Sequence, residues 1–302
     1  MAPNRGPGAK MRGVPVDVAI VTAALSRAHD EDLGPTRTAL EARGATTETV
    51  DWHDPGVDWS RFGLVLVRSP WDYTQRLPEY LAWIDAVAGV SRLVNDPAVL
   101  RWCSDKHYLA ELADRGAPVI PTTLIHPGEP VLLPEADELV VKPAVSAGSR
   151  DTERHPHERR TDAAAHVERL LAAGRDAVVQ PYVASVDHRG ETAVICFDGV
   201  PSHAIRKGPI LRGGVREVVG DLYAAEDISP RSATEAELDA ARRVLALLPV
   251  TDPPTYARID LVEGRDGQPL LLEVEANEPS LFLDHAPGAA DRYAAAELRR
   301  LG

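Results

Sequence analysis

Two predicted strands near the C-terminal end of the chain alternate charged and apolar residues, as strands with one polar face do. They span residues 255–263 and 269–277, and their charged face carries Arg258, Asp260, Glu273, Glu275 and Asn277. A turn of about four residues around Asp266-Gly267 puts Asp260 opposite Glu273 and Arg258 opposite Glu275. Carboxylate and carboxamide oxygens gathered on one face repel each other unless a cation intervenes, and this donor set suits Mg²⁺ that bridges substrate phosphates. The alternative is a solvated amphipathic hairpin in which Arg258 neutralises a neighbour.

Two lysines and a loop of small residues precede this hairpin along the chain. Lys142 lies near the end of a predicted strand, and the loop after it consists of Ser146, Ala147, Gly148 and Ser149. The backbone N–H groups of such a loop can approach phosphate oxygens closely. Lys106 projects from the preceding predicted helix and supplies a second ammonium group. Because the loop does not match a P-loop, an exposed strand end is the alternative for Lys142.

Composition limits the classes of partner. The 302 residues include 33 basic and 46 acidic ones, which gives a net charge of −13, and the isoelectric point is near 5.2. No cationic surface is therefore expected for nucleic acid or for anionic membranes. Cys103 and Cys196 are the two cysteines of the sequence, which excludes a disulfide scaffold and favours a cytoplasmic protein. We expect residues 1–12 to be a disordered leader and find no apolar run of about 18 residues that would span a membrane.

The elements around these motifs predict an α/β and α+β protein of three parts. Residues 13–100 alternate strands at 16–24, 46–51 and 62–68 with helices at 34–43 and 77–90, which is the pattern of an open parallel α/β domain. In such sheets ligands bind beyond the carboxyl ends of the strands. This rule indicates Thr22 and the segment after the third strand, which carries Arg68, Ser69, Trp71, Asp72 and Tyr73.

The central part, residues 101–184, is predicted as a mixed α+β region. A helix within 95–116 is followed by strands at 117–125, 138–144 and 176–183, with a helix before the last of these that ends at Gly174. The charged segment 150–160 is expected to be a loop with solvated His155 and His157. The last part, residues 185–302, adds a hairpin at 192–208 with a turn at Asp198-Gly199, and a helix at 234–249. Thr234 and Glu237 predict a capping box at the start of that helix.

The order of these features resembles the ATP-grasp superfamily of carboxylate-amine ligases from about Asn95 to Asn277, preceded by the expected α/β domain. The resemblance implies an ATP-grasp fold with ATP and Mg²⁺ as cofactors. By the same resemblance Lys106 and Lys142 contact ATP phosphates under a flap formed by residues 146–149, and Arg258 stabilises the transferring phosphoryl group. Backbone groups of Gln180, Pro181, Tyr182 and Val183 hold adenine, although Gln180 stands where relatives often have an acidic residue. The resemblance also implies that Glu191 binds the ribose. Mg²⁺ is then held by Asp260, Glu275 and Asn277, with Glu273 as a substitute. Whether Glu278 also reaches the metal stays open.

More narrowly, the stretches VLVRSPWDY, VVKPAVSAGSRDT, QPYVASVDHRGETAV, HAIRKGP and EPSLFLDHAPGAADR resemble the D-cycloserine synthetase group, ligases that cyclise O-ureido-D-serine. The resemblance implies a small amino acid substrate, an acyl phosphate intermediate, and release of ADP, phosphate, carbon dioxide and ammonia. The expected catalytic residues are Arg206, Lys142 and Arg258. The candidates for substrate contact are Arg68, Ser69, Trp71, Asp72, Tyr73, Lys207, Arg150 and Ser280. The alternatives are a ligase that joins an amino acid to a separate amine and a nucleotide-binding regulator without turnover. The oligomeric state stays open, with a homodimer as one option.

Overall fold

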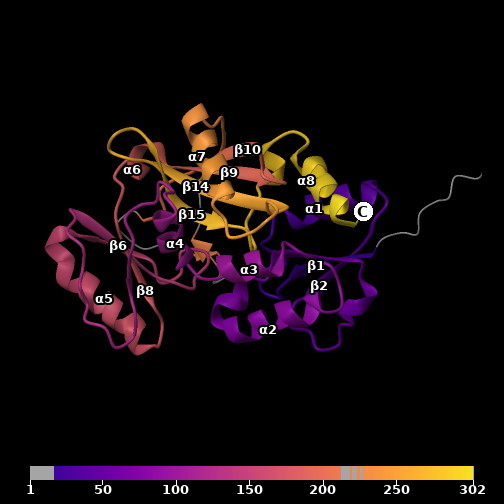
Figure 1. Ribbon diagram of the computed structural model, residues 1–302, viewed down its shortest axis with the longest axis horizontal. Coiled ribbons are helices and arrows are strands. Elements are labelled where there is room, and N and C mark those ends of the chain that lie inside the picture. Colours follow the sequence, from indigo (N-terminus) through magenta and orange to yellow (C-terminus); the bar gives the residue numbers. More distant parts are fainter. Residues whose placement is uncertain (1–16, 212–217, 220–222, 225–226, 302) are drawn as a thin grey trace, which may run out of the picture.

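A computed structural model describes residues 17–211, 218–219, 223–224 and 227–301 of the chain. The leader predicted for residues 1–12 lies outside the described residues. Three larger sheets, each with its own helices, form an elongated molecule within this part of the chain (Figure 1). Among the described helices, none combines the length and the apolar character that crossing a membrane requires.

The first sheet is parallel and has the strand order β2-β1-β3-β4. Its elements are β1 (Asp17–Thr22), α1 (Leu33–Ala42), β2 (Thr46–Asp51), β3 (Leu64–Ser69), α2 (Leu77–Ala88), β4 (Leu93–Val94) and, after it, α3 (Pro97–Cys103). Alternation along β3 buries both faces, because Val65 and Val67 pack with α2 while Leu64 and Leu66 pack with α1. The open parallel α/β domain predicted from the sequence is thus confirmed.

The second sheet is antiparallel, has the order β5-β8-β6-β7 and lies at one end of the molecule (Figure 1). It consists of β5 (Thr123–Ile125), β6 (Glu138–Pro143), β7 (Glu153–Pro156) and β8 (Ala177–Pro181), and α5 (Arg160–Ala172) covers one face. Its core is small and separate, with Leu139, Val141 and Val179 packed against Val167 and Leu170 of α5. We call this unit the lid sheet.

The third sheet is antiparallel and has the order β13-β10-β9-β14-β15. Its strands are β9 (Glu191–Phe197), β10 (Val200–Lys207), β13 (Ile228–Arg231), β14 (Tyr256–Glu263) and β15 (Pro269–Glu275). The remaining elements are α4 (Tyr108–Asp114), α6 (Val186–Arg189), β11 (Val218–Val219) paired with β12 (Tyr223–Ala224), α7 (Glu235–Ala246) and α8 (Ala289–Leu298). The predicted capping box of Thr234 and Glu237 starts α7.

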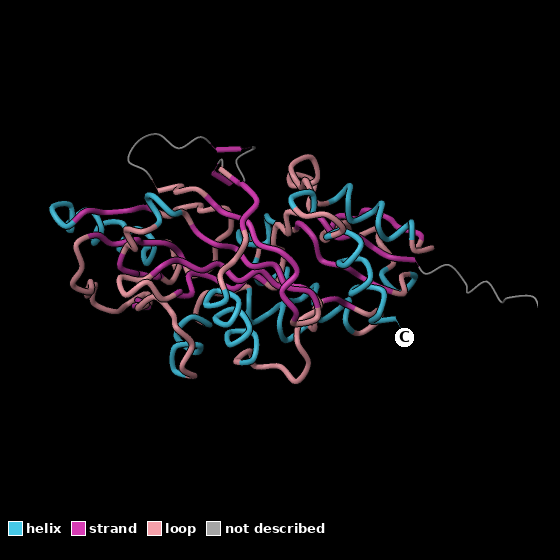
Figure 2. Tube along the Cα trace, turned by 90° about the horizontal axis from the view of Figure 1, so that it is seen from above, coloured by secondary structure: helices cyan, strands magenta, loops and turns pink. Residues whose placement is uncertain are grey.

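The first and third sheets share one core. Val18 and Ile20 of β1 pack in the same cluster as Ala193 and Ile195 of β9 and Tyr293 of α8. Tyr256 on β14 also donates its hydroxyl hydrogen toward the carbonyls of Val67 (3.0 Å) and Asn277 (2.9 Å). Seen from above, the strands of the three sheets follow one another along the long axis (Figure 2). The N-terminal sheet and the antiparallel sheet therefore form one body, and the lid sheet projects from it.

Two local expectations are wrong. The helix predicted within 95–116 is broken into α3 and α4, and Lys106 lies in the break, where its backbone N–H donates to the carbonyl of Ala144 (3.0 Å). The charged segment 150–160 is not a loop, because it contains β7, and His155 is 4 % exposed under α5 beside His166. In both places a contact distant in sequence overrides the local pattern.

Candidate active site

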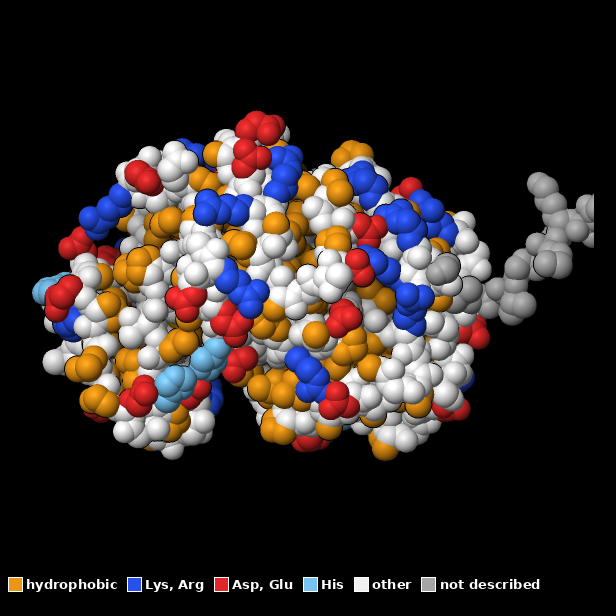
Figure 3. All heavy atoms as spheres, viewed as in Figure 1, with side chains coloured by type: hydrophobic (Ala, Val, Ile, Leu, Met, Phe, Trp, Pro, Cys, Tyr) orange, Lys and Arg blue, Asp and Glu red, His pale blue; other side chains and the backbone are white. Residues whose placement is uncertain are grey.

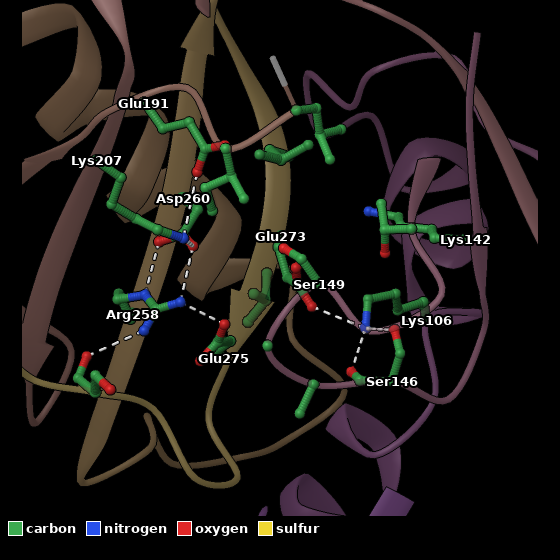
Figure 4. A pocket seen from close by; sticks show the side chains of 18 of the residues that line it. Lys106, Lys142, Ser146, Ser149, Glu191, Lys207, Arg258, Asp260, Glu273 and Glu275 are labelled. Atoms are coloured by element: carbon green, nitrogen blue, oxygen red, sulfur yellow. Dashed lines mark hydrogen bonds and ion pairs between the residues drawn. The ribbon is translucent and has the colours of Figure 1, made fainter. Parts of the chain in front are cut away.

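A cavity of about 500 Å³ lies where the three sheets meet, within the range of small-molecule sites. Its lining comes from the lid sheet, from β14 and β15, and from the segments that follow β1 and β3. In the space-filling view, the surface is notched where the lid sheet and the N-terminal domain diverge (Figure 3). Acidic and basic side chains of widely separated segments converge inside the cavity (Figure 4).

The acidic wall is the β14–β15 hairpin, in the register that the sequence predicts. Arg258 pairs with Glu275 and Asp260 with Glu273 across the two strands. The opposite face, which carries Ala257, Ile259 and Leu261, packs against α7, as alternation requires. The hairpin is therefore buried on its apolar face and presents its charged face to the cavity.

Arg258 is held in place by the groups around it. Its Nε and Nη2 donate to the Asp260 carboxylate at 2.8 and 3.0 Å, and its Nη1 donates to the carbonyl of Ser280 at 3.1 Å. It also pairs with Glu275 (Figure 4). Burial opposes ionisation of Asp260, but Arg258 and Lys207 outweigh it and lower its pKa to about 2. The guanidinium is thus a fixed, buried cation on the cavity wall.

Lys207 and Glu191 line the cavity on the same side as Arg258 and Asp260. The Lys207 ammonium lies 3.3 Å from the Glu191 carboxylate and 3.2 Å from the Asp260 carboxylate. Both side chains come from the paired strands β9 and β10, in which Lys207 lies opposite Glu191. The register of this second hairpin places a cation next to the acidic wall.

Lys106 joins the small-residue loop to the hairpin. Its ammonium donates to the Ser146 carbonyl at 2.7 Å and lies 3.0 Å from Glu273. Gly148 and Ser149 in this loop have positive φ angles of 62° and 59°, so the chain turns sharply beside the cavity. The loop is therefore tied to the opposite wall through one lysine.

Lys142 differs from the other cations. Its side chain is 6 % exposed and lines the cavity, yet within the described residues no hydrogen bond or ion pair engages its ammonium group (Figure 4). Burial lowers its pKa, against the opposing charge of Glu273. A buried ammonium without a partner is unfavourable unless an anion binds there, so this position is suited to an anionic ligand.

The donor set also fits Mg²⁺. Burial and the charges of Glu273 and Asp260 raise the pKa of Glu275 to about 7 despite Arg258, and burial with the charge of Glu275 raises that of Glu278 to about 8. The Oδ1 atom of Asn277 accepts from Tyr80 at 2.6 Å, which directs the carboxamide. These carboxylates are close together, so each one makes ionisation of the others less favourable. A divalent cation that prefers oxygen ligands would stabilise their ionised forms.

The other end of the cavity is apolar. Ile120, Val186 and Val262 form a small cluster there with Tyr182 and Val183 packed against it. The side chain of Gln180 is buried nearby and donates to Thr122 Oγ1 at 2.9 Å. The cavity therefore has an apolar end and a charged end.

Most of the predicted site residues line this one cavity. They are Lys106, Lys142, Ser146, Ala147, Gly148, Ser149, Gln180, Pro181, Tyr182, Val183, Glu191, Arg258, Asp260, Glu273, Glu275, Asn277, Trp71, Tyr73, Lys207 and Ser280. Their roles toward a ligand stay predictions.

Five predicted residues lie outside the lining, namely Arg68, Ser69, Asp72, Arg150 and Arg206. Arg206 is adjacent to Lys207 on β10, so its side chain leaves the opposite face, where it donates to the Arg189 carbonyl (3.0 Å) and pairs with Asp227 (3.2 Å). We therefore replace Arg206 with Lys207 as the cation of this strand that faces the cavity.

Near the end of β3 these side chains have partners within the protein. Arg68 is fully buried between Asp30 (3.2 Å) and Asp32 (3.4 Å) and donates to the Pro279 carbonyl (3.0 Å). Ser69 bonds Thr22 at 2.8 Å, and Asp72 accepts from Trp52 at 2.7 Å. Arg150 is half-buried next to the small-residue loop, where its backbone N–H donates to the Ala147 carbonyl at 3.3 Å.

The sequence reasoning missed His29, Glu31 and Asp32, which line the cavity from the segment after β1. The rule that ligands bind beyond the carboxyl ends of parallel strands pointed to this segment through Thr22. Nothing in their spacing singled them out, because they approach the hairpin only after the chain has folded.

The three-part arrangement and this cavity define an ATP-grasp ligase, an ATP-dependent enzyme. A crystal structure of the D-cycloserine synthetase DcsG superposes with a TM-score of 0.86 at 40% identity, and covers 95% of this chain and 100% of that one. A D-alanine--D-alanine ligase from Bacillus anthracis has the same fold, with a TM-score of 0.65 at 13% identity over 95% of this chain and 97% of its own.

Sequence comparison gives the narrower family. The cycloserine biosynthesis protein DcsG of Streptomyces lavendulae is 43% identical over 297 residues, which are 94% of this chain and 98% of that protein. The family model for the N-terminal domain of D-cycloserine synthetase DcsG matches residues 18–95. The chain belongs to the D-cycloserine synthetase family of ATP-grasp ligases.

Proposed function

We propose that this enzyme uses ATP and Mg²⁺ to cyclise O-ureido-D-serine to D-cycloserine. The substrate rests on the similarity to DcsG along nearly the whole chain. The chemistry rests on one observation, the unpartnered buried ammonium of Lys142 in a cavity whose other wall is the acidic hairpin. An Mg²⁺-bound polyphosphate complements both groups at once.

Activation of the carboxylate is the first proposed step. A carboxylate oxygen is a poor leaving group, so the γ-phosphoryl group is transferred to it, the bond to the β-phosphate breaks, and an acyl phosphate and ADP form. Lys142 and Lys106 neutralise the phosphate oxygens, and Arg258, held by Asp260 and Ser280, stabilises the charge on the transferring group. Asp260, Glu275 and Asn277, with Glu273 or Glu278, would hold Mg²⁺, which would supply positive charge to screen the phosphates.

Ring closure is the second step. The ureido nitrogen bonded to oxygen attacks the acyl phosphate carbon, phosphate leaves, and the five-membered ring forms. Hydrolysis of the carbamoyl group with one water molecule then releases carbon dioxide and ammonia. The loop 146–149, tied to Glu273 through Lys106, covers the intermediate and keeps other water molecules from the acyl phosphate.

The amino acid lies at the end of the cavity lined by Trp71, Tyr73 and Glu278. Burial together with the charge of Glu278 raises the pKa of Tyr73. This wall offers a carboxyl group, which a bound ammonium would help to ionise, and two aromatic rings for the carbon chain of the substrate. The apolar end around Ile120 and Val262 then receives adenine.

The test is to incubate the protein with Mg-ATP and O-ureido-D-serine and to measure D-cycloserine and ADP. We expect both products in equal amounts, and neither with the Lys142→Ala variant, while Arg265→Ala, which alters an arginine with 93 % side-chain exposure, serves as the matched control. ADP formed only when two amino acids are present would instead identify a ligase that uses a separate amine. ATP binding without ADP formation in any mixture would contradict an enzymatic role for this site.

A further inference from the structure

A second cluster of potential ligands lies outside the cavity. The Oδ2 atom of Asp176 is 3.1 Å from Nε2 of His107 and 3.0 Å from Nδ1 of His126. The three ligand atoms lie within 4.8 Å of one another, and all three side chains are partly exposed. Neither the ligase chemistry nor the family assignment uses these residues.

The fold brings the three residues together from separate elements. In the lid sheet Ile125 of β5 is paired with Ala177 of β8, so His126 and Asp176 occupy the next opposed positions. The backbone N–H of Ala144 donates to the Asp176 carbonyl (2.9 Å), and that of Lys106 donates to the Ala144 carbonyl (3.0 Å). This chain of bonds places His107, in the break between α3 and α4, beside Asp176.

Both nitrogens of the His107 ring face carboxylates. Nδ1 contacts Oδ1 of Asp105, whereas Nε2 faces Asp176. A neutral imidazole carries one N–H, so one of these contacts places a nitrogen lone pair against carboxylate oxygen. When Nδ1–H donates to Asp105, a cation at Nε2, either a proton or a metal ion, removes that repulsion. A carboxylate that orients a histidine through its other nitrogen is a common feature of metal sites.

We propose that His107, His126 and Asp176 bind a divalent transition-metal ion of the Zn²⁺ type. Ligand atoms on a tetrahedral zinc ion, with bonds of about 2.0–2.1 Å, are about 3.3 Å apart, close to the separations of Asp176 from the two imidazoles. The rings of His107 and His126 are nearly parallel, 14° apart, with centroids 5.3 Å apart, and one nitrogen of each lies next to the same Asp176 oxygen. Two nitrogen ligands disfavour Mg²⁺, which keeps this site chemically distinct from the cavity.

A second histidine cluster, formed by Glu153, His155 and His166, is a weaker candidate. Its two rings are 4 % and 2 % exposed and are hydrogen-bonded to each other at 3.2 Å. Its carboxylate is 3.9 Å from either ring and 3.3 Å from Arg169. The rings therefore satisfy each other, and the carboxylate has a cationic partner.

The proposed ion joins the lid sheet to the segment that carries Lys106. His126 directly follows β5 and Asp176 directly precedes β8 of the lid sheet. His107 adjoins Lys106 and precedes α4, which packs in the core of the antiparallel sheet. A bound ion therefore restrains the lid sheet at its base, and the melting temperature of the protein rises when zinc is added.

The test is calorimetric titration of ZnCl₂ into the untagged, metal-free full chain with excess Mg²⁺ present. We expect one zinc ion per chain, a loss of affinity of at least about 100-fold in His126→Ala, and a loss of about 10–100-fold in Asp105→Ala, which removes the orienting carboxylate. His157→Ala is the matched control, because it removes an exposed histidine from the same domain, and it should bind zinc as the parent does.

Two results would overturn the proposal. One is the absence of zinc binding to the parent protein. The other is unchanged affinity in His126→Ala, and a loss of affinity in His166→Ala would then place the ion at the other histidine cluster. Circular dichroism of each variant separates loss of the site from loss of the fold.

Discussion

Replacing Arg68 by methionine tests whether this arginine holds the fold or binds the substrate. Its guanidinium is buried between Asp30 and Asp32 and donates to the carbonyl of Pro279. The Asp32 carboxylate in turn accepts the backbone N–H groups of Leu281 (2.6 Å) and Leu283 (2.7 Å). Methionine keeps much of the volume but leaves two buried carboxylates without their cation.

The expected loss follows from these contacts. Removing one partner of a buried ion pair reduces the free energy of unfolding by about 3–5 kcal/mol, because the remaining charge stays buried and unpaired. For 302 residues about 1 kcal/mol lowers Tm by about 1.6 °C, so we expect a decrease of about 5–8 °C. The neighbouring surface pair of Arg61 with Glu48, 47 % and 51 % exposed, provides the control, since an exposed pair contributes less than about 1 kcal/mol.

The assay is calorimetric unfolding of Arg68→Met and Arg61→Met, combined with steady-state kinetics at a temperature where both variants are folded. A Tm within about 2 °C of the parent value, together with a raised KM for the amino acid, would refute the structural role and restore Arg68 as a substrate ligand. A large decrease in Tm with an unchanged KM supports the reasoning.

Three further predictions concern other parts of the molecule. Lys142→Met should lower kcat by at least about 100-fold without lowering Tm, because it removes an unpartnered buried ammonium; a lower Tm would contradict this reading of the site. Thr234→Ala should reduce stability by about 1 kcal/mol through loss of the capping box with Glu237, measured as a lower Tm; an unchanged Tm would show that the cap contributes nothing. Burial lowers the pKa of His155 and His166 below 6.5, so the unfolded chain binds more protons and stability falls as the pH drops below this value. His166→Gln should flatten that part of a plot of Tm against pH, and parallel plots would exclude His166 as the cause.

Several parts of the site could be predicted because their determinants are local. The alternation of residues 255–263 and 269–277 determines which face is charged. The predicted pairs of Arg258 with Glu275 and of Asp260 with Glu273 are present, but they depend on a register shift between Asp260 and Leu261 that the turn at Asp266-Gly267 did not indicate. The capping box is local as well. The order along the chain of Lys106, Lys142, the small-residue loop 146–149 and the hairpin then indicated the resemblance to the ATP-grasp superfamily.

Other parts depend on contacts that no local pattern contains. The sequence pattern did not reveal which of Arg206 and Lys207 faces the cavity, because the answer depends on which face of β10 packs against the N-terminal domain through Ile205. The two carboxylate partners of Arg68 are 38 and 36 residues away along the chain, and its carbonyl partner is 211 residues away. The break at Lys106 requires the carbonyl of Ala144, which only the folded lid sheet brings near.

The shared core of the first and third sheets has a consequence for engineering. The Asn95 side chain donates to the carbonyls of Tyr256 (2.9 Å) and Ala276 (2.8 Å), so the hairpin is fastened to the N-terminal domain by matched contacts on both sides. A chimaera that exchanges residues 17–95 with a distant relative breaks these contacts unless the hairpin is exchanged with them. The lid sheet has a separate core, so a graft of this unit has to preserve mainly the contacts at its base, such as the bond from the Lys106 backbone N–H to the Ala144 carbonyl.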